Sequence, residues 1–463
     1  MIKWSLPNIN PFKVQMAARE WSAGRRRAML HMEMGLGKTF TALDEYVDLL
    51  GRKKVDAMVV LAPDSLKETW AESIRKAGVD HLGQVVISPA VPAAFRSFWM
   101  VNYEAIRFDS VWVPLRDMVE QGGVFLVADE STRIKNFQAQ TTKRALVLGK
   151  KAEYTRALTG LAMVRDVMDW FPQLQFCGAL QGMNPYAFRA RYAKMGGYMG
   201  RQVVGIRDDT REELQGIIDG ASFRALKKDW LDLPAKNYAE RHIKMTPPQE
   251  KLYKQMADEM IILLEAGVTV EANMVISQLI KLQQIASGFI MDNTGHPRLL
   301  VDPDINPRMA EVEDILEGVS GKVLIFATYL ESIRLLHKRL SKRWRGGTLV
   351  GGDAAASAEA VRKFNSDPSH KYLLAQTDTG GIGHTMLGTR EARCATTIFF
   401  ENNFRFGARA QAEDRNHRIG QDAPCVTYVD FISSPVDRHV IRSLQTKKDL
   451  ITSLVDNRDA LHS

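Results

Sequence analysis

Short apolar runs recur along the chain, separated by longer stretches in which apolar residues repeat at helical spacing. The continuous runs read "AMVVLAP" (57–63), "VFLVADE" (124–130), "KVLIFATY" (322–329), "KYLLAQT" (371–377) and "TTIFFEN" (396–402). Runs of this length are typical of strands buried on both faces of a parallel sheet. Strands that alternate with helices predict an α/β fold.

Helical patterns lie between and after these runs. Leu43, Tyr46, Val47 and Leu50 fall at i, i+3, i+4 and i+7, which is one face of a helix. The stretches 247–267 and 275–289 also predict helices, and 291–308, rich in Pro, Asp, Asn and Gly, predicts a linker. The pattern therefore predicts two α/β lobes joined through a helical region, with a polar tail after about residue 440.

The composition is that of an ordinary soluble protein. The 463 residues suggest two or three domains at roughly 150 residues each. Three widely spaced cysteines, Cys177, Cys394 and Cys425, predict neither a disulfide framework nor a zinc site. The start "MIKWSLPNINPF" lacks a signal-peptide core, and no apolar stretch reaches the roughly 20 residues that span a bilayer. We expect a cytoplasmic protein (in the host cytoplasm if viral) with no membrane partner.

The formal net charge is +8. An excess of cations favours binding to polyanions, above all nucleic acid, because neutralised phosphates release counterions. Many basic proteins bind no nucleic acid, so the charge supports this hypothesis without establishing it.

The stretch "HMEMGLGKT" (31–39) has the composition of a phosphate-binding loop. Such a loop needs small residues where the backbone wraps the phosphates, a lysine for their charge and a hydroxyl for magnesium. Gly35, Gly37, Lys38 and Thr39 supply these, between an apolar run and an amphipathic helix. One departure is Met32, which occupies the first glycine position of the general pattern GxxxxGK followed by Ser or Thr. The alternative is a glycine turn that happens to precede a lysine.

An acidic pair ends the run "VFLVADE". A phosphate loop requires a magnesium-holding acid at the end of another strand, and Asp129 fits that role. Glu130 would accept a proton from the attacking water. Alone, the pair reads equally as helix-capping acids after a strand.

Two arginines in "QAEDRNHRIGQ" (411–421) are candidates for contact with a γ-phosphate. On a helix, Arg415 and Arg418 at i and i+3 would share a face. A solvated charged helix explains the same pattern.

Together these motifs resemble the Swi/Snf-type ATPases of helicase superfamily two, which typically show DEMGLGKT, DEAHRIKN and QAxDRxHRIGQ in this order. The resemblance covers nearly the whole chain, through further segments such as "LAPDSLKETW" (61–70), "VNYEAIR" (101–107), "FRALKKDWLDLPAK" (223–236) and "QTDTGGIGHTML" (376–387). The chain departs from the family pattern at positions that mostly couple hydrolysis to DNA movement: Ser131, Thr132, "TGLA" (159–162), Thr379, Thr385 and Phe404.

The resemblance implies roles for individual residues. ATP would contact the adenine-reading Gln15, the loop residues Glu33, Met34, Gly35, Leu36, Gly37, Lys38 and Thr39, and Gly383 of the second lobe. Mg²⁺ would bind Thr39 and Asp129, and catalysis would use Lys38, Glu130, Arg415 and Arg418. Ser65, Tyr103 and Thr377 match positions near the nucleic-acid backbone.

The resemblance also implies two RecA-like lobes with parallel sheets and helical insertions between them. We expect an N-terminal lobe with a helical insertion, a helical protrusion and linker, a C-terminal lobe and a tail, at residues 1–235, 236–305, 306–440 and 441–463. The leading hypothesis is a minimal DNA-stimulated ATPase that translocates on duplex DNA without strong sequence preference. The alternatives are a strand-separating DNA or RNA helicase, a catalytically idle nucleic-acid-binding scaffold and a small-molecule kinase. The sequence does not identify protein partners.

Overall fold

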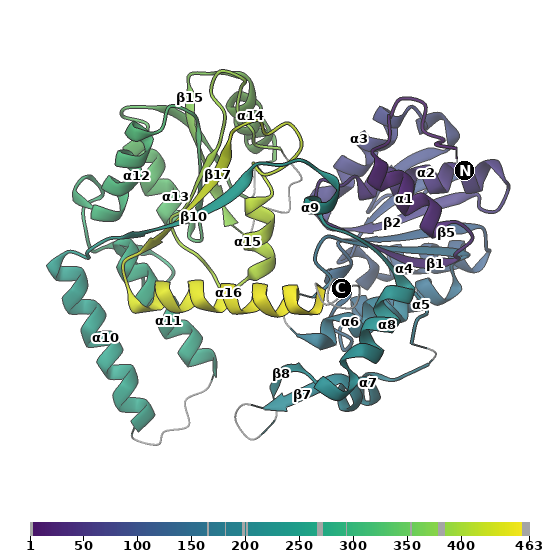
Figure 1. The fold of residues 1–463 in the computed structure, drawn as a ribbon, viewed down its shortest axis with the longest axis horizontal. Coiled ribbons are helices and arrows are strands. Elements are labelled where there is room, and N and C mark those ends of the chain that lie inside the picture. The colour runs from purple at the N-terminus through teal and green to yellow at the C-terminus, as the bar shows by residue number, and fades with distance from the viewer. Residues whose placement is uncertain are drawn as a thin grey trace. The chain divides into compact units, whose positions relative to one another are not determined.

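Two compact units make up the chain, and each contains one parallel sheet (Figure 1). The computed structural model describes residues 3–163, 166–180, 182–196, 200, 202–265, 272–292, 294–351, 354–377 and 385–455. We call Met1–Asp232 the first lobe and Leu233–Leu450 the second lobe. The predicted fold class, α/β with two parallel sheets, is confirmed.

The described part of the first lobe holds a seven-stranded sheet in which every pair is parallel, in the order β3-β4-β2-β5-β6-β1-β9. The strands of the predicted runs are fully buried, as parallel strands covered on both faces must be. The sheet consists of β1 (Arg27–Met32), β2 (Ala57–Ala62), β3 (Gln84–Ile87), β4 (Ser97–Asn102), β5 (Val124–Asp129), β6 (Tyr154–Thr159) and β9 (Ser222–Ala225).

Helices and a hairpin complete the first lobe. Apolar residues of α2 and α3, such as Tyr46 and Trp70, pack with Val60 and Phe125 of the sheet in one buried cluster. The helices are α1 (Lys13–Ser22), α2 (Lys38–Gly51), α3 (Lys67–Ala77), α4 (Asp109–Glu120), α5 (Gln140–Lys151), α6 (Trp170–Phe176), α7 (Pro185–Tyr192), α8 (Arg211–Ala221) and α9 (Lys227–Trp230), and the hairpin is β7 (Ala193–Gly196) with β8 (Gln202–Ile206).

The described part of the second lobe holds a six-stranded sheet in which every pair is also parallel, in the order β10-β17-β16-β13-β15-β14. The sheet consists of β10 (Ala235–His242), β13 (Val323–Ala327), β14 (Arg345–Leu349), β15 (His370–Gln376), β16 (Thr396–Phe399) and β17 (Cys425–Ile432). Its helices are α10 (Pro247–Glu265), α11 (Ala272–Ser287), α12 (Pro307–Gly318), α13 (Leu330–Leu340), α14 (Ala354–Ser366), α15 (Phe406–Glu413) and α16 (Pro435–Val455).

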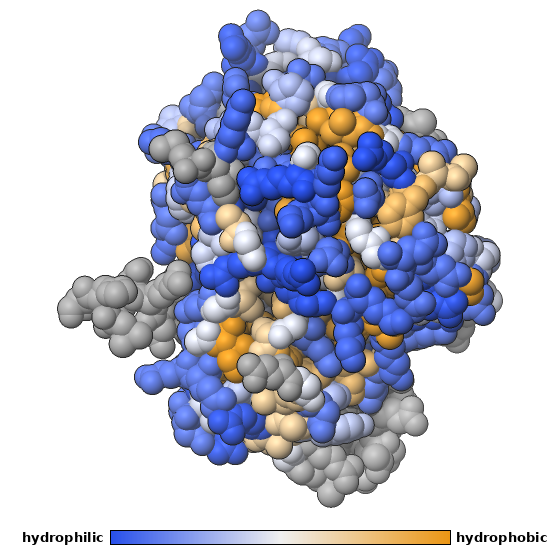
Figure 2. Space-filling view, turned by 90° about the vertical axis from the view of Figure 1, so that its right-hand side faces the viewer, coloured by the Kyte–Doolittle hydropathy of each residue, from blue (hydrophilic) through white to orange (hydrophobic). Residues whose placement is uncertain are grey.

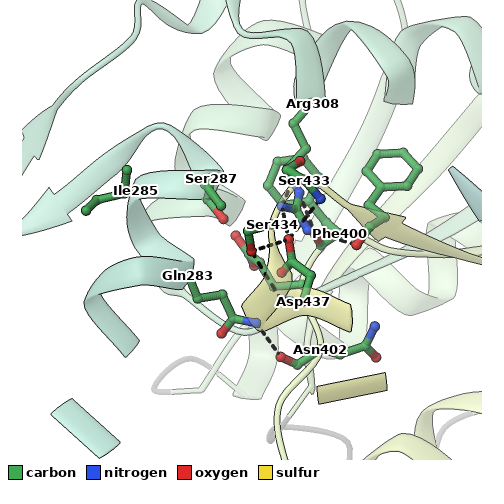
Figure 3. Close-up of polar contacts among 12 residues, drawn as sticks. Gln283, Ile285, Ser287, Arg308, Phe400, Asn402, Ser433, Ser434 and Asp437 are labelled. Carbon is green, nitrogen blue, oxygen red and sulfur yellow. Dashed lines mark hydrogen bonds and ion pairs between the residues drawn. The ribbon is translucent and has the colours of Figure 1, made fainter. Parts of the chain in front are cut away.

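Buried polar contacts hold α11, α12 and α16 to the strand ends of the second lobe (Figure 3). The Arg308 guanidinium donates to the Phe400 carbonyl at 2.9 Å and pairs with Asp437 at 3.1 Å. Gln283 on α11 donates to the Asn402 carbonyl at 2.8 Å. Because Arg308 and Asp437 are almost fully buried, losing either would leave an unpaired buried charge.

Two segments of the second lobe hold secondary structure that the sequence pattern did not predict. The predicted linker over 291–308 contains an antiparallel hairpin, β11 (Phe289–Met291) with β12 (Pro297–Leu299), and the start of α12. The predicted tail after residue 440 continues α16, because Val436, Val440 and Leu444 form an apolar stripe that packs on the helices before it.

The surface is mostly hydrophilic on the face shown in Figure 2, where apolar residues appear in separate groups. The most exposed large apolar side chains in the described residues are Ile305, Tyr186 and Phe108. A lipid bilayer could not be crossed by any helix in the described part of the chain, since none combines the necessary length with enough apolar character.

Candidate active site

The loop between β1 and α2 turns twice through left-handed backbone before the helix begins. Strand β1 ends at Met32 and α2 begins at Lys38, as the sequence predicts. Gly35 and Gly37 have φ angles of 81° and 84°, which glycine adopts without strain. A Cβ atom on Gly37 would also lie 2.2 Å from Nε2 of Gln15. The backbone conformation therefore favours glycine at position 37, and any larger residue would also require the Gln15 side chain to move.

Lys38 lies at the first position of α2. Its Nζ atom donates to the main-chain carbonyls of Met32 at 2.8 Å and Glu33 at 3.3 Å, so the side chain folds back over the loop. The first N–H groups of an α-helix lack partners within the helix and carry partial positive charge. The ammonium and these N–H groups make this end of α2 suited to an anion such as a phosphate.

The other residues of this loop contact further segments of the first lobe. The Glu33 carboxylate accepts a hydrogen bond from the main chain at the start of α9. The loop at Met34 lies against Gly160, where a Cβ would come within 3.2 Å of the Met34 nitrogen. Leu36 is buried in the core, and Thr39 is half-buried in the first turn of α2.

The phosphate-loop candidate is the loop between β1 and α2. Gln15 on α1 lies against this loop and is almost fully buried, with 1% of its surface exposed. Its Oε1 accepts from the N–H of Phe12 at 2.7 Å, and its Nε2 donates to the carbonyl of Gly37 at 3.1 Å. Both ends of the amide therefore bind main chain. Oε1 keeps one acceptor position and Nε2 one donor, so an adenine base would not have to replace either bond, but it would need access to a side chain that is now buried.

Asp129 and the phosphate-loop candidate share one edge of the sheet. Asp129 of β5 lies opposite Leu158 of β6, and Leu158 lies opposite Leu30 of β1 on its other side. Neighbouring strands are about 4.8 Å apart, so two intervals separate the two chain segments by roughly 10 Å. Because the strands are parallel, β1 and β5 both end at this edge, which is where α/β sheets bind ligands.

The Asp129 carboxylate is held from several sides. Its Oδ2 accepts from Nε1 of Trp70 at 2.8 Å, its Oδ1 from the N–H of Glu130 at 2.9 Å, and its main-chain carbonyl from the Tyr103 hydroxyl at 2.7 Å. Burial raises the pKa of the Asp129 carboxyl above its ordinary value, while the Trp70 hydrogen bond and the charge of Lys38 act in the opposite direction. These contacts fix one orientation of a buried acid.

Glu130 has left-handed backbone, with φ 47° and ψ 55°. This conformation costs about 1–3 kcal/mol for a residue with a Cβ, so its surroundings must enforce it. The next residue, Ser131, is buried and donates to Oε1 of Gln173 at 2.7 Å. Gln173 in turn donates to the Ala162 carbonyl at 2.7 Å. Ser131, where the family has alanine, thus ties the acidic pair to the "TGLA" segment.

The residues implied near nucleic acid differ in exposure. Ser65 is exposed in the 3-10 turn Asp64–Leu66, just before α3. Tyr103 is 2% exposed and its hydroxyl donates to Asp129, while Thr377 is 3% exposed and donates to the Ala327 carbonyl at 3.2 Å. Neither Tyr103 nor Thr377 presents its hydroxyl at the surface, so their predicted position near nucleic acid stays a prediction.

The arginine motif is not a continuous helix, which corrects the argument from helical spacing. Helix α15 ends at Glu413, and Arg415 and Arg418 lie in the following turns. The chain leaves the helix because Asn416 turns inward and donates to the Cys394 carbonyl at 3.2 Å. Arg415 is buried and Arg418 is half-buried, so the two side chains do not share an exposed helical face.

Burial lowers the pKa of the Arg418 guanidinium below its ordinary value, and Asp414 acts in the opposite direction. Arginine nevertheless stays charged in proteins, so Arg418 remains a cation suited to a phosphate. Gly383, the other second-lobe residue implied for the nucleotide, lies outside the described residues.

Sequence reasoning assigned no role to three buried residues at the candidate site: Trp70, Gln173 and His31. The His31 ring lies edge-on to Trp170 at 5.7 Å, and burial, together with the charge of Arg224, lowers its pKa to about 3. A neutral imidazole therefore sits beside the loop at neutral pH. Trp70 and His31 lie in motifs that the sequence singles out, "LAPDSLKETW" and "HMEMGLGKT", but the motifs do not show what these two side chains contact.

A family model described as SNF2-related domain matches residues 14–288, more than half of the chain. The chain belongs to the Swi/Snf-type ATPases of helicase superfamily two, and the resemblance seen in the motifs is confirmed.

Individual relatives are distant. The uncharacterized ATP-dependent helicase MG018 of Mycoplasma genitalium is 23% identical over 90% of this chain, and the human DNA repair and recombination protein RAD54-like is 22% identical over 94%. The chain spans 39% of the length of the first and 63% of the second. The solved Sulfolobus solfataricus SWI2/SNF2 ATPase core in complex with dsDNA is 21% identical, with a TM-score of 0.44 over 99% of this chain and 96% of that one.

Proposed function

We propose that this protein hydrolyses ATP and uses the energy to move along duplex DNA, without strong sequence preference. The observation that carries the proposal is the shared sheet edge, where Lys38 at the start of α2 and the Asp129–Glu130 pair at the end of β5 come together. Family membership supports the reaction, and the net charge of +8 supports a polyanionic partner.

The residues of the first lobe fit Mg²⁺-ATP as substrate. The Thr39 hydroxyl and the Asp129 carboxylate are oxygen ligands of the kind Mg²⁺ prefers. A carboxylate offers about four acceptor positions, and hydrogen bonds from Trp70 and the Glu130 N–H take one on each oxygen. Bound Mg²⁺ would neutralise charge on the phosphates and on the departing ADP.

Hydrolysis then requires positioned groups and one proton acceptor. The Lys38 ammonium would exchange its carbonyl partners for phosphate oxygens. Glu130 would take a proton from water as the water oxygen bonds to the γ-phosphorus and the bond to the ADP oxygen breaks. Arg415 and Arg418, from the second lobe, would stabilise charge on the γ-phosphate.

Movement along DNA would follow from a change in the arrangement of the two lobes during each round of ATP binding and hydrolysis. ATP favours the arrangement in which the second-lobe arginines reach the γ-phosphate, and hydrolysis removes that preference. If each lobe grips the phosphodiester backbone, alternate closing and opening advances the protein along DNA. DNA is named in one distant relative, the RAD54-like protein, which supports DNA over RNA as the partner.

We expect turnover of ATP to rise when duplex DNA is added. Steady-state hydrolysis should be measured with duplex DNA, single-stranded DNA, RNA and no polymer, on the same preparation. Preference for RNA would favour the RNA-helicase alternative, and ATP binding without turnover would favour the scaffold. Turnover without polymer dependence would favour a small-molecule kinase, tested by adding acceptor substrates. Triplex displacement without strand separation would distinguish a translocase from a helicase.

We expect Arg418→Ala to bind ATP but to hydrolyse it at least 10²-fold more slowly, the order of effect for one lost charge-stabilising group. The measurement is DNA-stimulated turnover beside binding of a non-hydrolysable ATP analogue. Arg390→Ala, which removes an exposed arginine from the same lobe, is the matched control. Wild-type turnover in Arg418→Ala would remove this arginine from the active site.

A further inference from the structure

Asp129 is held by two aromatic side chains that come from the side of β5 away from the phosphate-loop candidate. The sheet order β4-β2-β5-β6-β1 puts β2 and β4 on one side of β5 and the loop after β1 on the other. Trp70 lies on α3, which follows β2, and Tyr103 directly follows β4. Two separate segments therefore converge on one acid.

Each contact constrains a different part of Asp129. The Trp70 indole N–H fixes Oδ2 at 2.8 Å, and the Tyr103 hydroxyl fixes the main-chain carbonyl at 2.7 Å. With Oδ1 bound to the next N–H at 2.9 Å, the carboxylate has one preferred rotation. Tyr103 also holds the peptide that leads into Glu130, whose left-handed backbone must be maintained by its neighbours.

Ordinary core packing does not account for the contact that Trp70 makes; Tyr103 has a main-chain acceptor, as buried tyrosines often do, but that acceptor is the carbonyl of Asp129 itself. Trp99 in β4 is as buried as Trp70, and its Nε1 donates to the Ala90 carbonyl at 2.9 Å, away from the candidate site. Tyr46 on α2 is also fully buried, and its hydroxyl donates to the Asp56 carbonyl at 3.3 Å. A buried tryptophan or tyrosine finds a main-chain acceptor readily. Trp70 instead meets a carboxylate that keeps further acceptor positions for a ligand.

We propose that Trp70 and Tyr103 are positioning residues that orient Asp129 to receive the Mg²⁺ of a Mg²⁺-nucleotide, an inference that rests on the proposed function. Groups behind a metal ligand fix its orientation, and losing one typically costs 10–100-fold in metal affinity or activity. Trp70 and Tyr103 act through Asp129 and do not touch the nucleotide.

The test compares Trp70→Phe and Tyr103→Phe with the matched controls Trp99→Phe and Tyr46→Phe. Each variant loses one buried N–H or O–H donor, but only the first two lose a contact with Asp129. Affinity for a non-hydrolysable ATP analogue is measured with Mg²⁺ and again with EDTA. For each variant, the ratio of the affinity with Mg²⁺ to the affinity with EDTA gives the gain from Mg²⁺. We expect this ratio to be about 10-fold or more lower in the test variants than in the controls. In EDTA their affinity should match that of the controls.

Two results separate failure of this inference from failure of the proposed function. If the unsubstituted protein gains no affinity from Mg²⁺, the proposed function fails. If it gains affinity and the test variants keep the full gain, the positioning role is overturned.

A measurement on the unsubstituted protein covers the case in which a variant does not fold. Among the indole N–H signals of its eight tryptophans, we expect one to shift when Mg²⁺ is added to the analogue complex. Absence of any shift in a complex that binds Mg²⁺ would likewise overturn the role of Trp70.

Discussion

Glu130→Gln should abolish ATP turnover while the protein still folds and binds nucleotide. The substitution keeps the size of the side chain and removes the group proposed to accept a proton from the attacking water. Loss of a general base typically costs 10²–10⁴-fold in rate, so DNA-stimulated turnover should fall by that order. Glutamine can adopt the same left-handed backbone as glutamate at this position. The protein should therefore still fold, and the free energy of unfolding, measured beside turnover, checks this.

The matched control for this experiment is Glu104→Gln. Glu104 is exposed close to the candidate site, next to Tyr103, and its substitution removes the same charge. Turnover should persist in Glu104→Gln, whereas binding of a non-hydrolysable ATP analogue should persist in both variants. Undiminished turnover in purified Glu130→Gln would refute the role assigned to this residue.

Five inner strands of the two sheets, β2, β5, β13, β15 and β16, could be predicted from the sequence because their signal is local. A run such as "VFLVADE" is apolar at successive positions, which suits a strand covered on both faces, and β5 occupies Val124–Asp129 as expected. The turn into α2 could also be predicted from the sequence, because Gly35 and Gly37 adopt the left-handed backbone of this turn without strain. Both features depend on residues close together in the chain.

The contacts that surround Asp129 could not be predicted in the same way. Trp70 and Asp129 are 59 residues apart, and Ser131 and Gln173 are 42 apart. Their hydrogen bonds depend on the order of strands in the sheet, which no short-range pattern encodes. Ser131 replaces the alanine of the family motif DEAHRIKN. Its hydroxyl nevertheless links the acidic pair to the "TGLA" segment, because it donates to Gln173, which donates to the Ala162 carbonyl.

The spacing of Arg415 and Arg418 suggested a helix, but the structure has none at these residues. Arg415 and Arg418 have helical spacing, but Asn416 between them bonds to main chain at a strand end, and the helix stops before it. Satisfying the buried polar groups of such a side chain outweighs a weak helical preference.

Several polar groups of the candidate site already have protein partners in this structure. The amide of Gln15 binds main chain at both ends, and the ammonium of Lys38 binds two loop carbonyls. Nucleotide binding must therefore exchange hydrogen bonds as well as form new ones, so its net free energy is a difference between two sets of contacts. The charge of Lys38 would favour phosphate in that exchange, because an ammonium is attracted more strongly by an anion than by neutral carbonyls.

Lys38→Ala should consequently abolish both turnover and nucleotide binding. Without the ammonium, turnover should fall at least 10²-fold. Because the carbonyls of Met32 and Glu33 lose their donor, the nucleotide-free protein should also lose about 1 kcal/mol of stability. Thermal unfolding with and without an ATP analogue checks both effects, since a ligand at 100 times its Kd stabilises a protein by about 2.7 kcal/mol. Lys54→Ala, an exposed lysine in the same lobe, should keep that stabilisation. Equal stabilisation of Lys38→Ala by the analogue would show that this loop does not hold the phosphates.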